Sequence, residues 1–516
     1  MKTMRNLGYA AAASLLPAMA MAQEEAMSLD DKVNAVFSDA TGPFVSFIFA
    51  PLPGTAFPWI VLWLVVGATI CSIYFGFVQF RRFGHAISLV KGDYSDPNDA
   101  GEVSHFQALA TALSGTVGLG NIAGVAVAVS IGGPGATFWM ILAGLLGMAT
   151  KFTECTLGVK YRNEFDDGHV SGGPMYYLEK GFAERGFFGG KFLAILFAIF
   201  CIGGSFGGGN MFQSNQAHAQ MANVIGDYPG WITGVVMAAL VFIVIAGGIK
   251  SIASVTDKLV PFMAVFYVGF SLLIIIMNFD MIGVAFGQIF QGAFTSMGLA
   301  GGAIGALIQG FRRAAFSNEA GVGSAAIAHS AVRTNEPVTE GIVALLEPFI
   351  DTVVICTMTA LVIIITGMLQ FDAETGAYIW DEAAGTIATE GGATGVELTS
   401  MAFSSVFPWF RYALAIAVVL FAFSTMISWS YYGVKAWTYL FGEGAVKELV
   451  FKLLFCFFTV IGAAASLGSV IDFSDAMIFA MAVVNIFGLY FLLPIVKREV
   501  KSYFARVDSG EIRKVK

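Results

Sequence analysis

Charged residues are scarce in this sequence. Only 12% of its 516 residues are Asp, Glu, Lys or Arg, while 57% are hydrophobic and the mean hydropathy is +0.75. Soluble domains usually carry about 25% charged residues, so the chain lacks the charge that a water-covered surface of this length requires. The net charge is −8 and the basic residues are scattered, which leaves no electrostatic footprint for nucleic acid. A soluble protein and a nucleic-acid-binding protein are both excluded.

Cysteine and histidine are also rare, with five residues of each. Every cysteine lies inside or beside an apolar stretch and none forms a CxxC pair, so we interpret them as packing residues and not as disulfides or metal ligands. The sequence therefore predicts no zinc, haem or iron–sulfur site and no organic cofactor, and it shows no obligate protein partner. An enzyme would need a convergent nucleophile, base or metal set, and the apolar stretches hold few His, Asp or Glu residues.

Long apolar runs take the place of charge. At about 20 residues per membrane-spanning helix, the sequence predicts an all-α polytopic membrane protein embedded in the lipid bilayer. Its eleven expected spans lie near 57–80, 105–131, 136–158, 192–222, 230–249, 259–279, 284–311, 339–369, 406–432, 448–469 and 474–496.

The N-terminus has the layout of a secretory signal. Lys2 and Arg5 precede an apolar run that is too short to span, and small residues follow at 20–22. We expect a cleaved signal peptide at 1–22, a periplasmic segment at 23–56, a transmembrane domain at 57–497 and a basic cytoplasmic tail at 498–516. A retained amphipathic start is the alternative.

Lys and Arg indicate the orientation, because short cytoplasmic loops collect them. With the N-terminus outside, the basic loops fall on one side, whereas the loop 370–405 holds six acids and no Lys or Arg. We expect a multi-pass protein of a bacterial inner membrane, with a periplasmic N-terminus, a cytoplasmic C-terminus and no Lys or Arg in mid-span near the binding site.

Glycine is abundant, at 60 residues, and two runs stand out, 114–124 in the second span and 297–306 in the seventh. Either run alone could serve close helix packing. Their helices, five spans apart, cross the membrane in opposite directions, as matching elements of an inverted repeat do, and such a pair points to a transporter binding site. Unwound half-helices offer N–H groups to an anion and carbonyls to a cation, which suits a zwitterion and Na+.

Several motifs then resemble a known family. The run ALSGTVGLGNIAGVAVAVSIGGPGATFWM at 112–140, GGPMYYLEKG at 172–181, GGGNMFQSNQ at 207–216 and FRRAAFSNEAGVGSAAIAHS at 311–330 are similar to the alanine or glycine:cation symporters. The resemblance implies the fold of the bacterial leucine transporter, with one extra N-terminal helix before a five-plus-five inverted repeat that contains two discontinuous helices. It also implies Na+-coupled uptake of small neutral amino acids such as alanine and glycine, with H+ as an alternative coupling ion.

The resemblance and the residue chemistry together give a candidate site. Backbone N–H groups near the first break would hold the substrate carboxylate, and the amides of the fourth span its amine, although interhelical hydrogen bonding would also explain an amide there. The predicted substrate-binding residues are Thr116, Gly118, Gly120, Asn121, Asn210, Gln213, Phe294, Met297, Gly301 and Trp429. Phe294 and Met297 could equally be packing residues.

A Na+ site is expected where the first broken helix meets the ninth span, because hard cations prefer oxygen ligands. The predicted ligands are the carbonyls of Ser114, Val117 and Phe421 and the hydroxyls of Ser424 and Thr425. Mid-helix hydroxyls often bond only to their own helix, and that reading stays open.

The remaining ionisable residues leave alternatives. Glu154 is expected to pair with Lys160 or Arg162, while Arg312, Arg313 and Glu319 are predicted to form an ion pair at an inner gate. Glu347 and Asp351 share a helix face, and Asp351 could either bind a broken helix or carry a proton. An uncoupled carrier or channel and a membrane enzyme are the competing functions, but no selectivity ring is visible.

Overall fold

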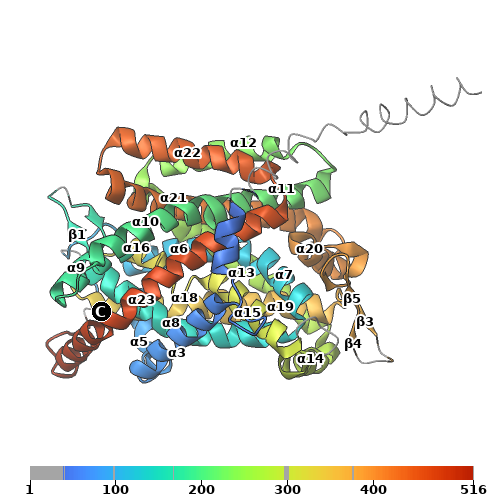
Figure 1. Cartoon of the computed structure of the whole chain (residues 1–516), viewed down its shortest axis with the longest axis horizontal. Coiled ribbons are helices and arrows are strands. Elements are labelled where there is room, and N and C mark those ends of the chain that lie inside the picture. Colours follow the sequence, from blue (N-terminus) through green and yellow to red (C-terminus); the bar gives the residue numbers. More distant parts are fainter. Residues whose placement is uncertain are drawn as a thin grey trace, which may run out of the picture.

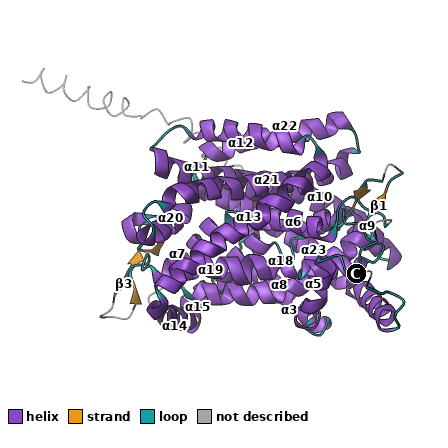
Figure 2. Cartoon of the chain, turned by 180° about the vertical axis from the view of Figure 1, so that it is seen from behind, coloured by secondary structure: helices purple, strands orange, loops and turns teal. Residues whose placement is uncertain are grey.

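The structure is a computed structural model that describes Asp39 and residues 41–96, 99–166, 168–295, 302–372, 374 and 377–514. The predicted signal peptide, half of the segment 23–56, and the predicted site residues Met297 and Gly301 lie outside these described residues. Nearly all of the described chain is helical, as Figures 1 and 2 show.

The helices follow the apolar stretches closely. Those before residue 230 are α3 (Trp59–Tyr74), α4 (Val78–Arg81), α5 (Phe83–Val90), α6 (His105–Thr116), η1 (Gly120–Gly124), α7 (Val125–Gly132), α8 (Gly135–Lys160), α9 (Pro174–Glu184), α10 (Gly190–Phe206), η2 (Gly207–Met211) and α11 (Phe212–Ile225). Those between 230 and 370 are α12 (Gly230–Ile245), α13 (Gly248–Met277), η3 (Phe279–Met281), α14 (Ile282–Phe294), α15 (Gly302–Asn318), α16 (Ala325–His329), α17 (Pro337–Ala344), α18 (Leu346–Pro348), η4 (Phe349–Cys356) and α19 (Thr357–Ile365). The last ones are η5 (Glu390–Gly392), α20 (Gly395–Val406), α21 (Phe410–Phe441), α22 (Ala445–Ala464) and α23 (Leu467–Asp508).

Among the described residues, six helices are long and apolar enough to cross a membrane. The pair α6 and η1–α7 makes a seventh if it counts as one span, bent by 51°. Helices α3 and α12 are shorter but also apolar. A helical membrane protein is thus confirmed, whereas the number of eleven spans stays a prediction.

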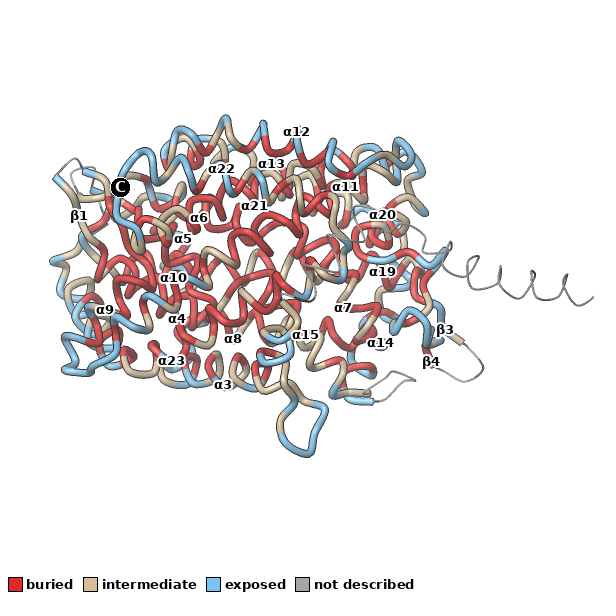
Figure 3. Tube along the Cα trace, turned by 45° about the horizontal axis from the view of Figure 1, so that its top comes forward, coloured by how far each residue is buried: buried red, intermediate tan, exposed pale blue. Residues whose placement is uncertain are grey.

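Helices far apart in the sequence pack side by side. Helix α8 lies against α15, α16 and α17, α10 lies against α21 and α23, and α12 lies beside α22 at the top of Figure 1. Helix α6 contacts α13, α16 and α21, so the broken helix passes through the interior. Figure 3 shows the buried residues gathered there. Large apolar side chains such as Ile243 and Val265 are exposed on the outside, as lipid-facing residues would be.

The two ends of the molecule differ in charge and structure (Figure 1). One end carries the hairpin β1 (Asn163–Glu164) and β2 (Val170–Ser171), helix α9 and the C-terminal part of α23; we call it the basic end. The other carries α14, α20 and two small hairpins formed by the acidic loop; we call it the acidic end. Those hairpins pair β3 (Phe371–Asp372) with β4 (Ala377–Tyr378) and β5 (Trp380–Asp381) with β6 (Thr386–Ile387).

The seventh predicted span contains two helices. The expected helix 284–311, broken at 297–306, corresponds to the separate helices α14 and α15, and α15 begins at Gly302. Residues 302–306 of the glycine run lie in α15, and 296–301 lie outside the described residues, so the predicted interruption between α14 and α15 stays a prediction. A further interruption comes after α15, at 319–324, where Glu319, Gly321 and Gly323 have φ values of 56°, 89° and 89°. Left-handed backbone cannot continue an α-helix, so the chain breaks there before α16.

Candidate functional site

The first break lies between α6 and η1, at Val117–Leu119. Three glycines, at 115, 118 and 120, surround it, and each weakens a helix by about 1 kcal/mol relative to Ala. Gly118 is also required sterically, because an added Cβ would lie 2.2 Å from Thr425 Oγ1 and 3.2 Å from Gln213 Oε1. Glycine thus allows the broken helix to approach both α21 and α11.

Side chains, and not the helix itself, satisfy the N–H groups at this break. Gly118 N–H donates to Asn121 Oδ1 at 2.9 Å, and Leu119 N–H donates to Gln213 Oε1 at 3.2 Å. In a continuing helix these N–H groups would donate to the carbonyls of Ser114 and Gly115. Those two carbonyls are therefore released from their usual donors, and they lie at the negative end of the α6 dipole.

Helix α21 runs alongside this end of α6. Ser424 Oγ donates to the Phe421 carbonyl at 2.9 Å, and Ser114 Oγ donates to the Ser424 carbonyl at 2.6 Å. One turn further on, Ser428 Oγ donates to the Thr111 carbonyl at 3.0 Å. The structure thus brings together Ser114, Val117, Phe421, Ser424 and Thr425, the five residues predicted to bind Na+.

Thr425 differs from its neighbours. Its side chain is 2% exposed, and its hydroxyl makes no hydrogen bond to any described residue. The bond to its own helix that the sequence left open is therefore not formed, although Ser424 does form one. A buried hydroxyl without a partner costs free energy. The Thr425 hydroxyl is therefore suited to bind a hard cation, which prefers oxygen ligands.

The carboxylate of Asp351 connects the two breaks. Asn121 Nδ2 donates to Asp351 Oδ1 at 2.6 Å, and Ser317 Oγ, near the end of α15, donates to Asp351 Oδ2 at 2.9 Å. Thr352 Oγ1 also donates to Oδ2, at 2.6 Å. An added Cβ on Gly120 would lie 3.3 Å from Ser317 Cα, which confirms how closely the two broken segments approach each other.

Trp429 lies between the second break and η2. Its Nε1 donates to Glu319 Oε1 at 2.9 Å, and Glu319 also accepts a hydrogen bond from Ser324. The indole covers Gly209, where an added Cβ would lie 2.2 Å from Trp429 Cγ. Only glycine at position 209 admits this packing. The structure therefore places Trp429 beside the second break, and its role in covering the substrate stays a prediction.

The predicted ion pair at an inner gate is wrong in its partners. Arg312 Nη2 donates to Asp475 Oδ2 at 2.8 Å, and Arg313 contacts the same carboxylate, while Glu319 bonds to Trp429 and Ser324. Asp475 is only eight residues into α23, about 12 Å from its start at 1.5 Å per residue. The pair is thus in the half of the molecule nearer the acidic end, and not toward the basic tail.

Two predicted substrate residues lie elsewhere. Asn210 Nδ2 donates to the Phe455 carbonyl at 2.6 Å, and its Oδ1 accepts from Thr459 at 2.8 Å. The alternative of interhelical hydrogen bonding therefore explains Asn210. Phe294 is 51% exposed at the end of α14 and its ring lies 5.1 Å from that of Phe138, so it packs on the outside of the helices, away from the breaks.

One basic residue does lie in mid-span, but it is paired with a carboxylate, so the expectation that no Lys or Arg there holds the substrate carboxylate stays a prediction. Lys151, in α8, is fully buried, and its Nζ lies 3.0 Å from Glu347 Oε1. Glu154 accepts a hydrogen bond from Asn485 and does not pair with Lys160, which contacts Glu499 instead. Buried charges need partners, and here they find them on other helices.

Sequence reasoning missed Asp475 and Ser317. Asp475 is an acid at the start of a predicted span, and an ionisable residue in the membrane is a functional candidate by default. That signal could have found it. Ser317 carries no such signal, because its importance comes from contact with Asp351 on another helix.

Helix α20 covers the first break from the acidic end. Thr399 Oγ1 donates to the Ile122 carbonyl at 3.1 Å, and Val396 N–H donates to Gln216 Oε1 at 3.1 Å. The region around the two breaks is thus covered by α20 on one side and by the cluster of Arg312, Arg313 and Asp475 on another.

Comparisons with known proteins agree with this geometry. The model of the sodium:alanine symporter family matches residues 44–516. The sodium/alanine symporter AgcS of Methanococcus maripaludis is 40% identical over 89% of this chain and 95% of its own length. The putative sodium/proton-dependent alanine carrier protein YrbD of Bacillus subtilis is 36% identical over 90% and 93%. The probable sodium/glutamine symporter GlnT of Bacillus subtilis is 32% identical over 87% and 90%.

The match extends over nearly the whole chain, so it includes both breaks, α21 and the Asp351 contacts. It confirms the resemblance found in the motifs and identifies a family of transporters and not of enzymes. The chain belongs to the sodium:alanine symporter family.

Proposed function

We propose that this protein is a secondary active symporter that couples inward Na+ movement to the uptake of small neutral amino acids such as alanine and glycine. The observation that carries the proposal is the meeting of the broken helix α6 with the unpartnered hydroxyl of Thr425. At one place it supplies carbonyl oxygens at a helix C-terminus and a buried hydroxyl that makes no hydrogen bond to a described residue, which is the ligand set of a hard cation.

The proposed Na+ ligands are the carbonyls of Ser114, Val117 and Phe421 and the hydroxyls of Ser424 and Thr425. Ser114 and Ser424 are already in contact across the two helices at 2.6 Å. A bound ion would compete for the Ser424 hydroxyl, which now donates to Phe421. Because α6 and α21 each supply ligands, Na+ binding would hold these two helices together.

The substrate is proposed to bind beside this ion, at residues 116–121. The N–H groups of Gly118 and Leu119 are held by the amide oxygens of Asn121 and Gln213, and a substrate carboxylate would take the place of these oxygens. Gln213 would then be free to bind the substrate amine, with Trp429 covering the site.

We also propose the finer architecture, with α3 as an extra helix before a five-plus-five inverted repeat. The two breaks are held against each other by Asp351, as corresponding half-helices of the two repeats would be. Rocking of one repeat against the other would then expose the same site first to the acidic end and later to the basic end, with Na+ stabilising the substrate-binding state.

Uptake by proteoliposomes that contain the purified protein tests this proposal. Labelled alanine should accumulate above equilibrium under an inward Na+ gradient, and accumulation should disappear when K+ replaces Na+. Unlabelled glycine should compete. Accumulation that persists without Na+ and follows an imposed pH gradient would refute Na+ coupling in favour of H+, and equilibration without accumulation would indicate an uncoupled carrier.

A further inference from the structure

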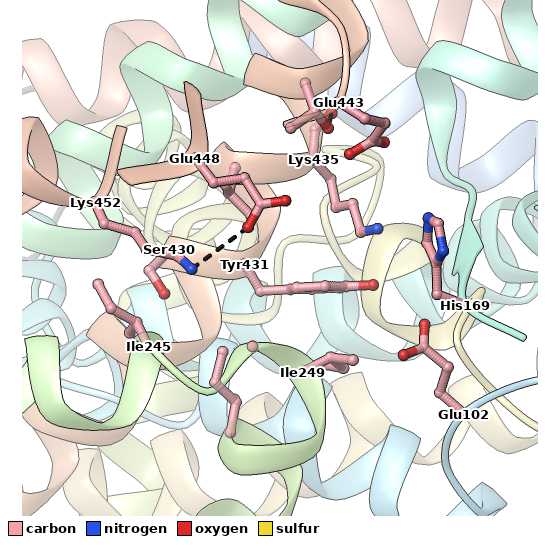
Figure 4. A pocket seen from close by; sticks show the side chains of 14 residues that line it. Glu102, His169, Ile245, Ile249, Ser430, Tyr431, Lys435, Glu443, Glu448 and Lys452 are labelled. Atoms are coloured by element: carbon pink, nitrogen blue, oxygen red, sulfur yellow. Dashed lines mark hydrogen bonds and ion pairs between the residues drawn. The ribbon is translucent and has the colours of Figure 1, made fainter. Parts of the chain in front are cut away.

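A second polar cavity lies toward the basic end, separate from the two breaks. It has a volume of about 110 Å³ and is shown in Figure 4. Its lining comes from Glu102 in the loop before α6, the loop between β1 and β2, the junction of α12 and α13, the second half of α21, Glu443 after α21, and α22.

A buried tyrosine points into this cavity. Tyr431 is 4% exposed, and its hydroxyl makes no hydrogen bond to any described residue. Figure 4 shows that this oxygen faces the space between Lys435, His169 and Glu102. Since a buried hydroxyl without a partner is costly, the cavity is equipped for a polar ligand.

Charges of both signs surround the Tyr431 hydroxyl. Glu102 and Glu443 supply carboxylates, and the ammonium of Lys435 lies on the same side of the cavity. Lys435 is anchored to the hairpin by donating to Ser171 Oγ at 2.7 Å. Such an arrangement suits a ligand that carries an ammonium group next to a carboxylate.

The opposite wall is apolar. Ile245, Ile249 and Ile252 line it, and none of them is more than 7% exposed. A zwitterion with a small apolar side chain could therefore place its charged groups at Tyr431 and Lys435 and its side chain against the isoleucines. A bare inorganic ion would make no use of this wall.

The cavity also lies along the same helix, α21, as the proposed Na+ site. Ser424, Ser428, Tyr431 and Lys435 follow one another at spacings of four, three and four residues, so they share one face of α21. Thr425 and Tyr431 are six residues apart, or about 9 Å along the helix at 1.5 Å per residue. A polar stripe thus connects the two places through the interface of α6 and α21.

From these observations we infer that the cavity is a second binding site for the transported amino acid, occupied on the way to the basic end. Glu102 and Glu443 bind the ammonium group, and Tyr431 and Lys435 bind the carboxylate. This inference rests on the proposed function, because it takes its ligand to be the substrate of the same transporter.

Equilibrium binding of labelled alanine to the purified full-length protein in Na+ tests it. The wild-type protein should bind two alanines per chain, and Tyr431→Phe and Glu102→Gln should each bind one. Tyr412→Phe, which changes the exposed hydroxyl at the other end of α21, is the matched control and should still bind two. A single alanine in the wild type, or two in both cavity variants, would overturn the inference.

Transport from each side gives a second measurement. In oriented proteoliposomes, Tyr431→Phe should raise the KM for alanine at the basic end about tenfold, the size of a lost hydrogen bond to a charged group, and leave the KM at the acidic end unchanged. Equal KM changes on both sides, or none, would count against the second site.

Failure of the proposed function would look different. If the wild-type protein neither binds nor accumulates alanine, the function itself is wrong. If the wild type accumulates alanine with Na+ but binds only one per chain, only the second site is wrong. If Na+ alone, without alanine, changed the environment of the cavity residues, the inference would also be overturned. Glu102→Gln serves as the second variant if Tyr431→Phe does not fold.

Discussion

Replacing Thr425 by valine should change stability in opposite directions with and without Na+. Valine has nearly the shape of threonine but no hydroxyl. Because the Thr425 hydroxyl is buried and makes no hydrogen bond to a described residue, its removal should stabilise the Na+-free protein. The same hydroxyl is a proposed Na+ ligand, so the variant should lose most of its stabilisation by Na+.

The magnitudes follow from the two roles. A buried polar group without a partner costs about 1–3 kcal/mol. We expect the free energy of unfolding of the Na+-free variant to exceed that of the wild type by about 1 kcal/mol, the low end of this range, because relaxation around the hydroxyl already offsets part of the cost in the wild type. A ligand at 100 times its Kd stabilises the folded state by about 2.7 kcal/mol. Loss of a hydrogen-bond-like contact to a charge weakens binding by about 1.5–3 kcal/mol, which would leave about 0.3–1.3 kcal/mol of Na+ stabilisation at the same Na+ concentration.

Thermal unfolding of the purified variant in detergent, in K+ and over a Na+ titration, measures both effects. The control is Thr156→Val, which also changes a buried threonine, but one whose hydroxyl donates to the Phe152 carbonyl at 2.7 Å in its own helix. Its Na+ response should match the wild type. A Thr425→Val protein that is less stable than the wild type in K+, or that keeps the full Na+ shift, would refute the reasoning.

Three further changes test other parts of the structure. Asp351→Asn should lower kcat/KM for alanine uptake at least about tenfold, because an amide cannot accept all the donors that join the two breaks; an initial rate within twofold of the wild type would contradict this. Gly118→Ala should abolish uptake, since its Cβ would lie 2.2 Å from a side-chain oxygen of α21, whereas Gly269→Ala, with open space around it, should transport normally; active Gly118→Ala protein would show that the close approach is not needed. The hydrogen bond from Tyr161 lowers the pKa of Glu184, so this carboxylate stabilises the fold fully above its unfolded pKa of about 4.3 and loses that effect as the pH falls through its lowered folded pKa; the Tm of Glu184→Gln should therefore be lower than that of the wild type at pH 7, and the difference should shrink as the pH falls below about 4.3, whereas a difference that stays constant with pH would point to another cause.

The first break could be predicted from the sequence because its cause is local. Glycines at 115, 118 and 120 weaken the helix wherever it packs, and the apolar pattern around them requires a span. The hydroxyls of Ser424 and Thr425 are adjacent in sequence, and the motif resemblance already paired their helix with the broken one. The family was predictable for the same reason, since its motifs are continuous segments.

The second break could not be located in this way. The glycine run at 297–306 predicted a second break, and no feature of the sequence pattern indicated one at 319–324. The structure shows an interruption at 319–324, where Gly321 and Gly323 adopt left-handed backbone and the preceding residues approach Gly120 and Asp351. Which glycine run unwinds depends on which one meets the other broken helix, and that is a property of packing.

Composition and periodicity by themselves determined that this chain enters a membrane and approximately where its helices lie, and the glycine run 114–124 indicated a break in one of them. Only the tertiary structure decided the partners of the polar groups. Arg312 and Arg313 bind Asp475 on a helix more than 160 residues later, and Lys151 binds Glu347, where sequence neighbours had suggested other pairs. Burial makes an unpaired charge very costly, so each charge takes the partner that folding brings within reach, and sequence distance does not predict that partner.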